Sequence, residues 1–160
     1  MLERKKLFVG HDANRAGAQL VLLHWLRERK ARGLSNFLLL VEGGSLLQEY
    51  KKVAKVWVWK TDIPFWFKIK QRIPKIKSRQ AWNHEPSEQK VLGILKSLRN
   101  EAFTSILGNT VSSVGLLREL ASLQIPMEVY VHELSHSIAT YTTALDRTFL
   151  ATGIQRLYAV

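Results

Sequence analysis

Residues 36–41, Asn36-Phe-Leu-Leu-Leu-Val41, decide the fold, because this run is apolar at every position after the first. A strand that is apolar on both faces is typical of a parallel sheet enclosed between helices. Five other segments also have strand character, at residues 6–10, 55–59, 104–108, 126–131 and 155–160. Apolar residues between them recur at helical spacing. This alternation predicts an α/β, Rossmann-like doubly wound and mostly parallel sheet of about six strands, with helices on both faces.

Several helix boundaries also follow from the sequence. We expect Asp12 or Asn14 to cap the first helix, over residues 16–32, and Ser45 to cap the second. Pro86 marks the start of another helix. A single helix is expected from about Ser135, because its apolar residues share a helical spacing. These residues are Ile138, Tyr141, Leu145 and Phe149.

The chain has 160 residues and a mass of 18.4 kDa, which suits one domain with its own core. It contains no cysteine, so disulfide scaffolds, thiolate zinc sites and a cysteine nucleophile are excluded. No apolar run approaches the roughly 20 residues that span a bilayer. Because the sequence stops within the apolar segment 155–160, we expect these residues to be part of a longer protein.

Positive charge is concentrated in one segment. Residues 51–79 contain ten Lys or Arg and one acid, a net charge of +9, while the whole chain carries +11. Residues 60–85 also interrupt the alternation as a basic and aromatic insertion. Aromatic and basic residues together suit an anionic membrane surface, which we favour, or a nucleic-acid backbone; a solvated loop is the third interpretation. The expected contact residues are Trp66, Lys68, Lys70, Arg72, Lys75 and Lys77. A non-catalytic α/β binding module that uses this segment is therefore an alternative function.

The sequence His132-Glu-Leu-Ser-His136 matches the H-E-x-x-H pattern of zinc peptidases. That pattern needs one helix through both histidines, so that the imidazoles lie one turn apart. Here the apolar segment 126–131 comes directly before His132, and the helix is expected to begin only at Ser135. Asp146 is the sole downstream candidate for a third ligand. We therefore expect no metal site and keep the metallopeptidase as an alternative.

Polar residues follow several of the predicted strands directly. They include His11 and Asp12, Asn109 and Thr110, and His132 and Glu133. In open α/β sheets, ligands bind outside the carboxyl ends of the strands, so a site is expected there. The alternative is that strand ends simply need polar turn residues. Gly17 lies in the expected first helical turn, where a backbone N–H can approach a phosphate.

Four motifs carry a resemblance to a known family. They are Phe8-Val-Gly-His-Asp-Ala-Asn-Arg-Ala-Gly-Ala18, Leu38-Leu-Leu-Val-Glu-Gly-Gly-Ser-Leu-Leu47, Leu107-Gly-Asn-Thr110 and Val129-Tyr-Val-His-Glu-Leu134. With the order of the elements, they resemble the N-terminal half of a bacterial family 4 glycosyltransferase of the two-Rossmann-domain (GT-B) type. The likeness covers nearly the whole chain except residues 60–85. It implies transfer of a sugar from a nucleotide-diphosphate donor to an acceptor, usually with retention of configuration.

The resemblance also implies roles for particular residues. Gly17 matches the glycine that lies over the donor diphosphate, although Ala16 stands where many members have a second glycine. His132 matches a histidine beside the donor sugar and is the catalytic candidate, followed by Glu133. Asn109 and Thr110 would lie on the same cleft wall and meet the acceptor. His11 is a further candidate for donor or acceptor binding.

The resemblance further implies which partners the chain has. The nucleotide-sugar is a substrate, so no cofactor and no metal is expected. The acceptor would be a glycan or a lipid-linked or anionic saccharide, and nucleic acid is not expected as a partner. Residues 1–160 would form the acceptor-side domain, without the donor-binding domain and its paired-Glu motif, and would be inactive alone. The expected location is the cytoplasm, at the inner face of the membrane.

Overall fold

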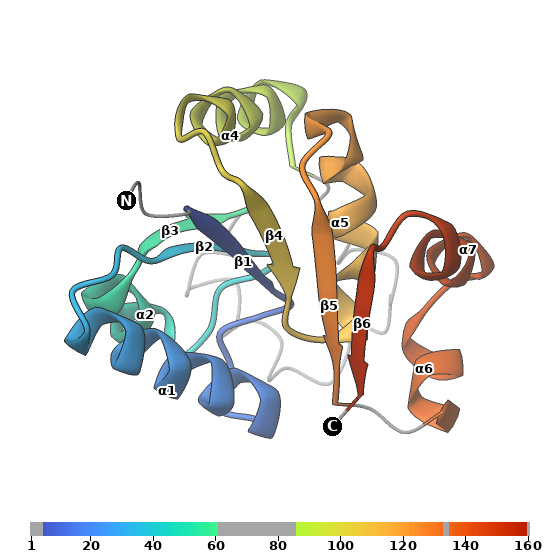
Figure 1. The fold of residues 1–160 in the computed structure, drawn as a ribbon, viewed down its shortest axis with the longest axis horizontal. Coiled ribbons are helices and arrows are strands. Elements are labelled where there is room, and N and C mark those ends of the chain that lie inside the picture. Colours follow the sequence, from blue (N-terminus) through green and yellow to red (C-terminus); the bar gives the residue numbers. More distant parts are fainter. Residues whose placement is uncertain (1–4, 61–85, 133–134, 160) are drawn as a thin grey trace, which may run out of the picture.

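The computed structural model describes residues 5–60, 86–132 and 135–159. These residues form one parallel sheet of six strands in the order β3-β2-β1-β4-β5-β6 (Figure 1). Its strands are β1 Lys6–Gly10, β2 Phe37–Leu40, β3 Lys55–Val58, β4 Ser105–Gly108, β5 Met127–Val131 and β6 Arg156–Ala159. This order is typical of the doubly wound fold, in which the chain adds strands outward from β1 on one side and then from β4 on the other. The predicted Rossmann-like α/β class is therefore confirmed.

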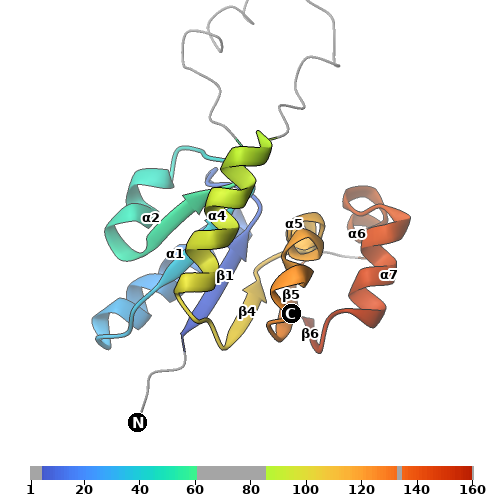
Figure 2. The same ribbon diagram turned by 90° about the horizontal axis from the view of Figure 1, so that it is seen from above.

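Helices lie on both faces of the sheet (Figure 2). They are α1 Gly17–Ala31, α2 Leu47–Val53, α4 Glu88–Asn100, α5 Val114–Glu119, α6 Ser135–Tyr141 and α7 Ala144–Thr152, with the 3-10 helices η2 Val111–Ser113 and η3 Leu120–Leu123. The helices α1 and α2 cover one face, while α4 and α5 cover the other. In the described parts of the chain, no helix is long and apolar enough to cross a membrane.

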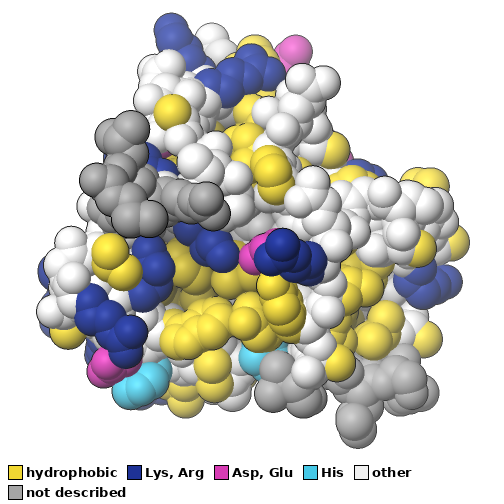
Figure 3. Space-filling model, viewed as in Figure 1, with side chains coloured by type: hydrophobic (Ala, Val, Ile, Leu, Met, Phe, Trp, Pro, Cys, Tyr) yellow, Lys and Arg dark blue, Asp and Glu magenta, His cyan; other side chains and the backbone are white. Residues whose placement is uncertain are grey.

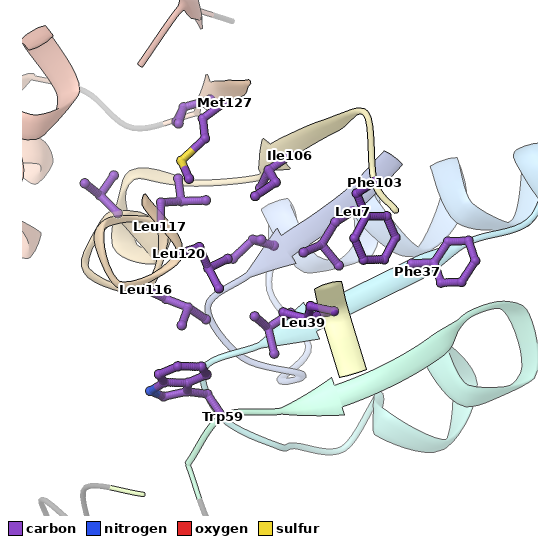
Figure 4. Packing of buried hydrophobic residues seen from close by; sticks show 14 of the residues in the cluster. Leu7, Phe37, Leu39, Trp59, Phe103, Ile106, Leu116, Leu117, Leu120 and Met127 are labelled. Carbon is purple, nitrogen blue, oxygen red and sulfur yellow. The ribbon is translucent and has the colours of Figure 1, made fainter. Parts of the chain in front are cut away.

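The face under α4 and α5 holds the larger core cluster. Leu7 of β1 and Leu39 of β2 are fully buried and belong to the same cluster as Leu98 of α4 and Leu117 of α5. Figure 4 shows Leu7 and Leu39 on the same side of the sheet as the side chains of α5. Burying a leucine of this kind contributes about 1.5–3 kcal/mol.

The opposite face packs on α1 and α2. Leu38 and Leu40 of β2, which alternate with Leu39, meet Leu26 of α1 and Tyr50 of α2 in a second cluster. Asn36, just before β2, is 5% exposed and donates from Nδ2 to the carbonyls of Leu26 at 2.7 Å and Val53 at 3.0 Å. One buried amide therefore joins α1, α2 and β2.

Two of the predicted caps are wrong. The N-cap of α1 is Ala16, because Asp12 Oδ1 instead accepts from the Asn14 N–H at 2.7 Å and the Gln19 amide at 3.1 Å. The N-cap of α2 is Leu46, not Ser45. The N–H of Leu46 donates to the Ala13 carbonyl at 2.7 Å, so the loop after β2 is held by the loop after β1.

The single helix predicted from Ser135 to Phe149 is also wrong, since α6 ends at Tyr141 and α7 begins at Ala144. Thr143 is the N-cap of α7 and forms a capping box with Asp146. This box supplies partners for the first N–H groups of a new helix, and so stabilises a break that the apolar spacing conceals. Tyr141 and Leu145, at the break, are 64% and 68% exposed rather than part of the core.

Candidate functional site

The carboxyl edge of the sheet brings together residues that are far apart in sequence. In the parallel register Val9 of β1 pairs with Gly108 of β4, which pairs with Val129 of β5. His11, Asn109 and His132 follow these three strands within a few residues, so all three lie at one edge. This edge includes the point between β1 and β4 where the strand order reverses, which is the usual ligand position in such sheets.

His11 and Asp12 form a hydrogen-bonded pair at the end of β1. The ring Nδ1 of His11 lies 3.0 Å from Asp12 Oδ2. Burial raises the pKa of Asp12, but hydrogen bonds from the Asn14 N–H and from His11 outweigh it, so the pKa lies below the ordinary value. An ionised carboxylate only accepts, so Nδ1 carries the proton and donates it. In the neutral ring, Nε2 is then left as the acceptor.

The loops after β1 and β2 are joined through a glycine. A side chain at Gly44 would overlap the backbone of Ala13 and lie 2.7 Å from the Asn14 nitrogen. Glycine is therefore required there by contact between two backbones. Tyr50 lies against this region: burial, and secondarily the charge of Asp12, raise the pKa of its phenol, which donates to the Gln19 carbonyl at 2.7 Å. The loop at the carboxyl end of β1 is thus in contact with the loop after β2 and close to Tyr50 of α2.

The N-terminus of α1 is open to a ligand. Its N-cap, Ala16, makes no side-chain capping bond, and the first turn holds no acidic residue. Gly17 is exposed, and a Cβ built on it would have no atom within 4 Å. The first turn of a helix presents unpaired N–H groups and a partial positive charge. Gly17 therefore leaves room for an anion beside these N–H groups.

Asn109 and Thr110 are both buried, with different environments. Asn109 donates from Nδ2 to the Ala18 carbonyl at 2.9 Å, and its Oδ1 is buried without a hydrogen-bond partner among the described residues. Thr110 is the N-cap of η2 and accepts from the Ser112 N–H at 2.9 Å. Asn109 thus ties β4 to the first turn of α1, while Thr110 is engaged in capping.

A cavity of about 440 Å³ opens beside His11, between the strand ends and the helices α4 and α5. Its walls include Trp59 and Lys60, which follow β3, and Arg118 of α5. Lys60 pairs with Glu42 at 3.1 Å, and Arg118 lies 3.2 Å from Asp146. The sequence analysis missed these wall residues, although the strand-end rule applied to β3 would have found Trp59 and Lys60. Arg118 gave no such signal, since its position depends on how α5 packs.

His132 and His136 do not share a helix. His132 follows β5, its ring stacks on Tyr130 with centroids 6.2 Å apart, and α6 begins only at Ser135, as predicted. Among the described residues, no cluster of three or more His, Asp or Glu side chains could hold a metal. His132 therefore lies outside the helix that contains His136, whereas the zinc-peptidase pattern needs one helix through both.

Several predicted contact residues fall outside the part of the chain that the structure describes. They are Trp66, Lys68, Lys70, Arg72, Lys75, Lys77 and Glu133. Of the other candidates, His11 lines the cavity, whereas Gly17, Asn109, Thr110 and His132 are not among its wall residues. The candidate site is therefore the carboxyl edge of the sheet, with the cavity beside His11 at one end of it.

The structure therefore shows an α/β protein with a doubly wound parallel sheet, at whose carboxyl edge the candidate residues lie. Comparison of the chain with protein-family models finds no match, and neither do comparisons with curated proteins and with solved structures.

Proposed function

We propose that this chain is the N-terminal, acceptor-side half of a GT-B type glycosyltransferase. The protein would move a sugar from a nucleotide-diphosphate donor to an acceptor hydroxyl, with retention of configuration. The observation that carries the proposal is the uncapped N-terminus of α1 at Gly17, beside the edge where the strand order reverses. The motifs around Gly17, Asn109 and His132 support it as a resemblance.

The chemistry of sugar transfer suits these groups. The bond between the sugar C1 and the diphosphate oxygen breaks, and negative charge builds on the departing diphosphate. Backbone N–H groups at the start of α1 would stabilise that charge. His132, the proposed catalytic residue, would orient the donor sugar, which resembles an oxocarbenium ion in the transition state. The acceptor would enter from the side of Asn109 and Thr110, while His11 lines the cavity at the same edge of the sheet. Glu133, which lies outside the described residues, is a further candidate for this contact.

The first experiment probes the diphosphate position directly. We would titrate the isotope-labelled 160-residue protein with UDP and with GDP to about 10 mM and follow the amide signals, because millimolar affinity is expected from half of a site. The amides of residues 17–19 should shift, and Gly17→Ala should weaken the effect. Gly93→Ala is the matched control, since Gly93 in α4 also has open space around its Cβ position. Unshifted amides at 17–19, or equal shifts in both variants, would contradict the proposal.

The proposal also assigns donor recognition and acceptor recognition to two different domains. Donor recognition would depend on a second domain, so the 160 residues alone should show no transfer of sugar from a nucleotide-sugar to water or to a saccharide. Measurable turnover by this chain would overturn that division. The basic composition of residues 51–79 supports a lipid-linked or anionic acceptor and a place at the inner face of the membrane.

A further inference from the structure

One part of the sheet has helices on only one side. Phe8 of β1 pairs with Leu107 of β4, which pairs with Glu128 of β5 and through it with Arg156 of β6. Residues in register, and those two positions further along, share a face. Phe8 and Leu107 belong to the cluster under α1 and α2. Over β4, β5 and β6, however, none of the described helices lies on this face.

A hollow of about 350 Å³ marks this uncovered area, which we call the β4–β6 groove. Its walls come from Trp25 of α1 and the C-cap residue Arg32, and from Tyr130 and Tyr158 of the sheet. Figure 3 shows hydrophobic side chains gathered in the hollow beside α1, with charged side chains along its border. No wall residue is shared with the cavity beside His11. The groove is therefore separate from the candidate site.

The half of the groove near the carboxyl ends of the strands is aromatic. The ring of Tyr130 lies 5.0 Å from Trp25, edge to face, and 4.7 Å from Tyr158, stacked. Trp25 remains 36% exposed, and Val21, one turn earlier on α1, is 49% exposed. Rings fixed by one another offer a large contact surface at little entropic cost. A contiguous apolar surface with a polar border is typical of a protein interaction site.

The other half of the groove is charged. Glu128 lies between Lys6 and Arg156, at 3.3 Å from each. Arg29 stacks on Phe8 at 5.4 Å and donates from Nε to Asn36 Oδ1 at 3.0 Å, while Arg32 is exposed. With Glu28, the walls hold three basic and two acidic groups, a net charge of +1, and Arg156 adds a fourth basic group at their border. A partner here is favoured if it brings negative charge.

The spacing of the sheet indicates that an α-helix fits the groove. Neighbouring strands lie about 4.8 Å apart, so two strands span about 9.6 Å. Packed helices lie about 8–10 Å apart, so a helix beside α1 would lie over β4 and β5. Parallel to α1, it would place its carboxyl end beside Arg29 and Arg32, where basic groups complement the negative end of the helix dipole.

We propose that the β4–β6 groove binds an amphipathic α-helix of a partner protein, which packs apolar side chains on Trp25, Tyr130 and Tyr158 and turns an acidic carboxyl end toward Arg29 and Arg32. A second copy of this chain is disfavoured as the occupant. Each copy carries +11, and a symmetric pairing would bring two borders of net positive charge together. Charge complementarity therefore selects an acidic partner.

The test uses two synthetic peptides of about 15 residues, roughly 22 Å long as helices. Both carry Leu and Phe at helical spacing; one has Glu throughout its last turn, and the other has Lys. Fluorescence anisotropy measures their binding to the 160-residue protein. We expect the Glu peptide to bind at least about tenfold more tightly. Equal affinity for the two peptides, or no binding of the Glu peptide at about 1 mM, overturns the proposal.

Variants locate the binding. Trp25→Ser and, separately, Tyr158→Ser should each weaken the Glu peptide at least about tenfold, and circular dichroism checks that each remains folded. Arg32→Glu should weaken the Glu peptide and strengthen the Lys peptide. Arg99→Glu is the matched control, an exposed arginine in the last turn of α4, and should change neither affinity. Unchanged binding in both serine variants overturns the proposal, as does a dimer in sedimentation that Trp25→Ser abolishes.

Discussion

Strands β2 and β6 belong to the same parallel sheet but differ in burial, in their number of neighbouring strands and in helix cover. All four residues of β2 are buried, with β1 and β3 as neighbours and helices on both faces. In β6 only Tyr158 is partly buried, β5 is the one neighbour, and one face lies open. The difference shows that this sheet is buried on both faces at β2, whereas its β6 edge is exposed to solvent.

The largest difference in the free energy of unfolding is expected between a core substitution in β2 and a surface substitution in β6. Leu39→Ala in β2 removes a fully buried side chain and should lower the free energy of unfolding by about 2–5 kcal/mol. Leu157→Ala in β6 should change it by less than about 0.5 kcal/mol, because Leu157 is 52% exposed. Urea unfolding followed by circular dichroism measures both. Similar losses in the two variants would contradict the description of β6 as an open edge.

The loop that follows β2 should be nearly as sensitive. Gly44→Ala forces a Cβ into the backbone of Ala13 and should cost about 1–3 kcal/mol. Gly17→Ala, with open space at the first residue of α1, should leave stability unchanged or slightly raised. Thermal unfolding of the two variants compares them. If Gly17→Ala proves the more damaging change, the account of the β1 and β2 loops is wrong.

Substitutions of two tyrosines compare the stability contributed at the covered face of the sheet with that at the uncovered face. Tyr50→Phe removes the partly buried hydrogen bond from the phenol to the Gln19 carbonyl and should cost about 1–2 kcal/mol. Tyr158→Phe should have almost no effect on unfolding, because water reaches its partly exposed side chain. Denaturant midpoints at equal protein concentration measure the difference. A loss of stability confined to Tyr158→Phe would show that the β4–β6 groove is structurally closed.

The smallest expected effect is the pH dependence of stability that Asp12, at the end of β1, contributes. The pKa of Asp12 in the folded protein lies below its ordinary value of 3.8, so its ionised form stabilises the fold above that value. This contribution is lost as pH falls through about 4 and below. Asp12→Asn should flatten the pH dependence of the urea midpoint in this range. An unchanged pH profile in Asp12→Asn would place the titrating group elsewhere.

The order of strands and helices could be predicted because apolar spacing records which elements are buried. Residues 36–41 show this best, since β2 is buried on both faces. The break before α7 could not be predicted from spacing, because a capping box between Thr143 and Asp146 outweighs the continuous apolar pattern around it. Likewise, Asp12 forms bonds with Asn14 and Gln19 that compete with capping, and local sequence does not rank such alternatives.

The candidate site was predictable in part. The rule that polar residues gather after parallel strands placed His11, Asn109 and His132 at one edge, as the register confirms. It did not distinguish Thr110, which caps η2, from Asn109, whose Oδ1 is buried and unbonded among the described residues. It also missed Arg118, because no sequence spacing shows which side of α5 meets the cavity.

Asp146 has a consequence for experiments on the cavity. Its Oδ2 accepts from the Thr143 N–H at 2.9 Å and from the Thr143 hydroxyl at 2.7 Å, while Oδ1 lies 3.2 Å from Arg118. One carboxylate thus anchors the start of α7 and holds a cavity wall residue. Asp146→Ala therefore perturbs both at once, and a double-mutant cycle with Arg118→Ala assigns the share of each.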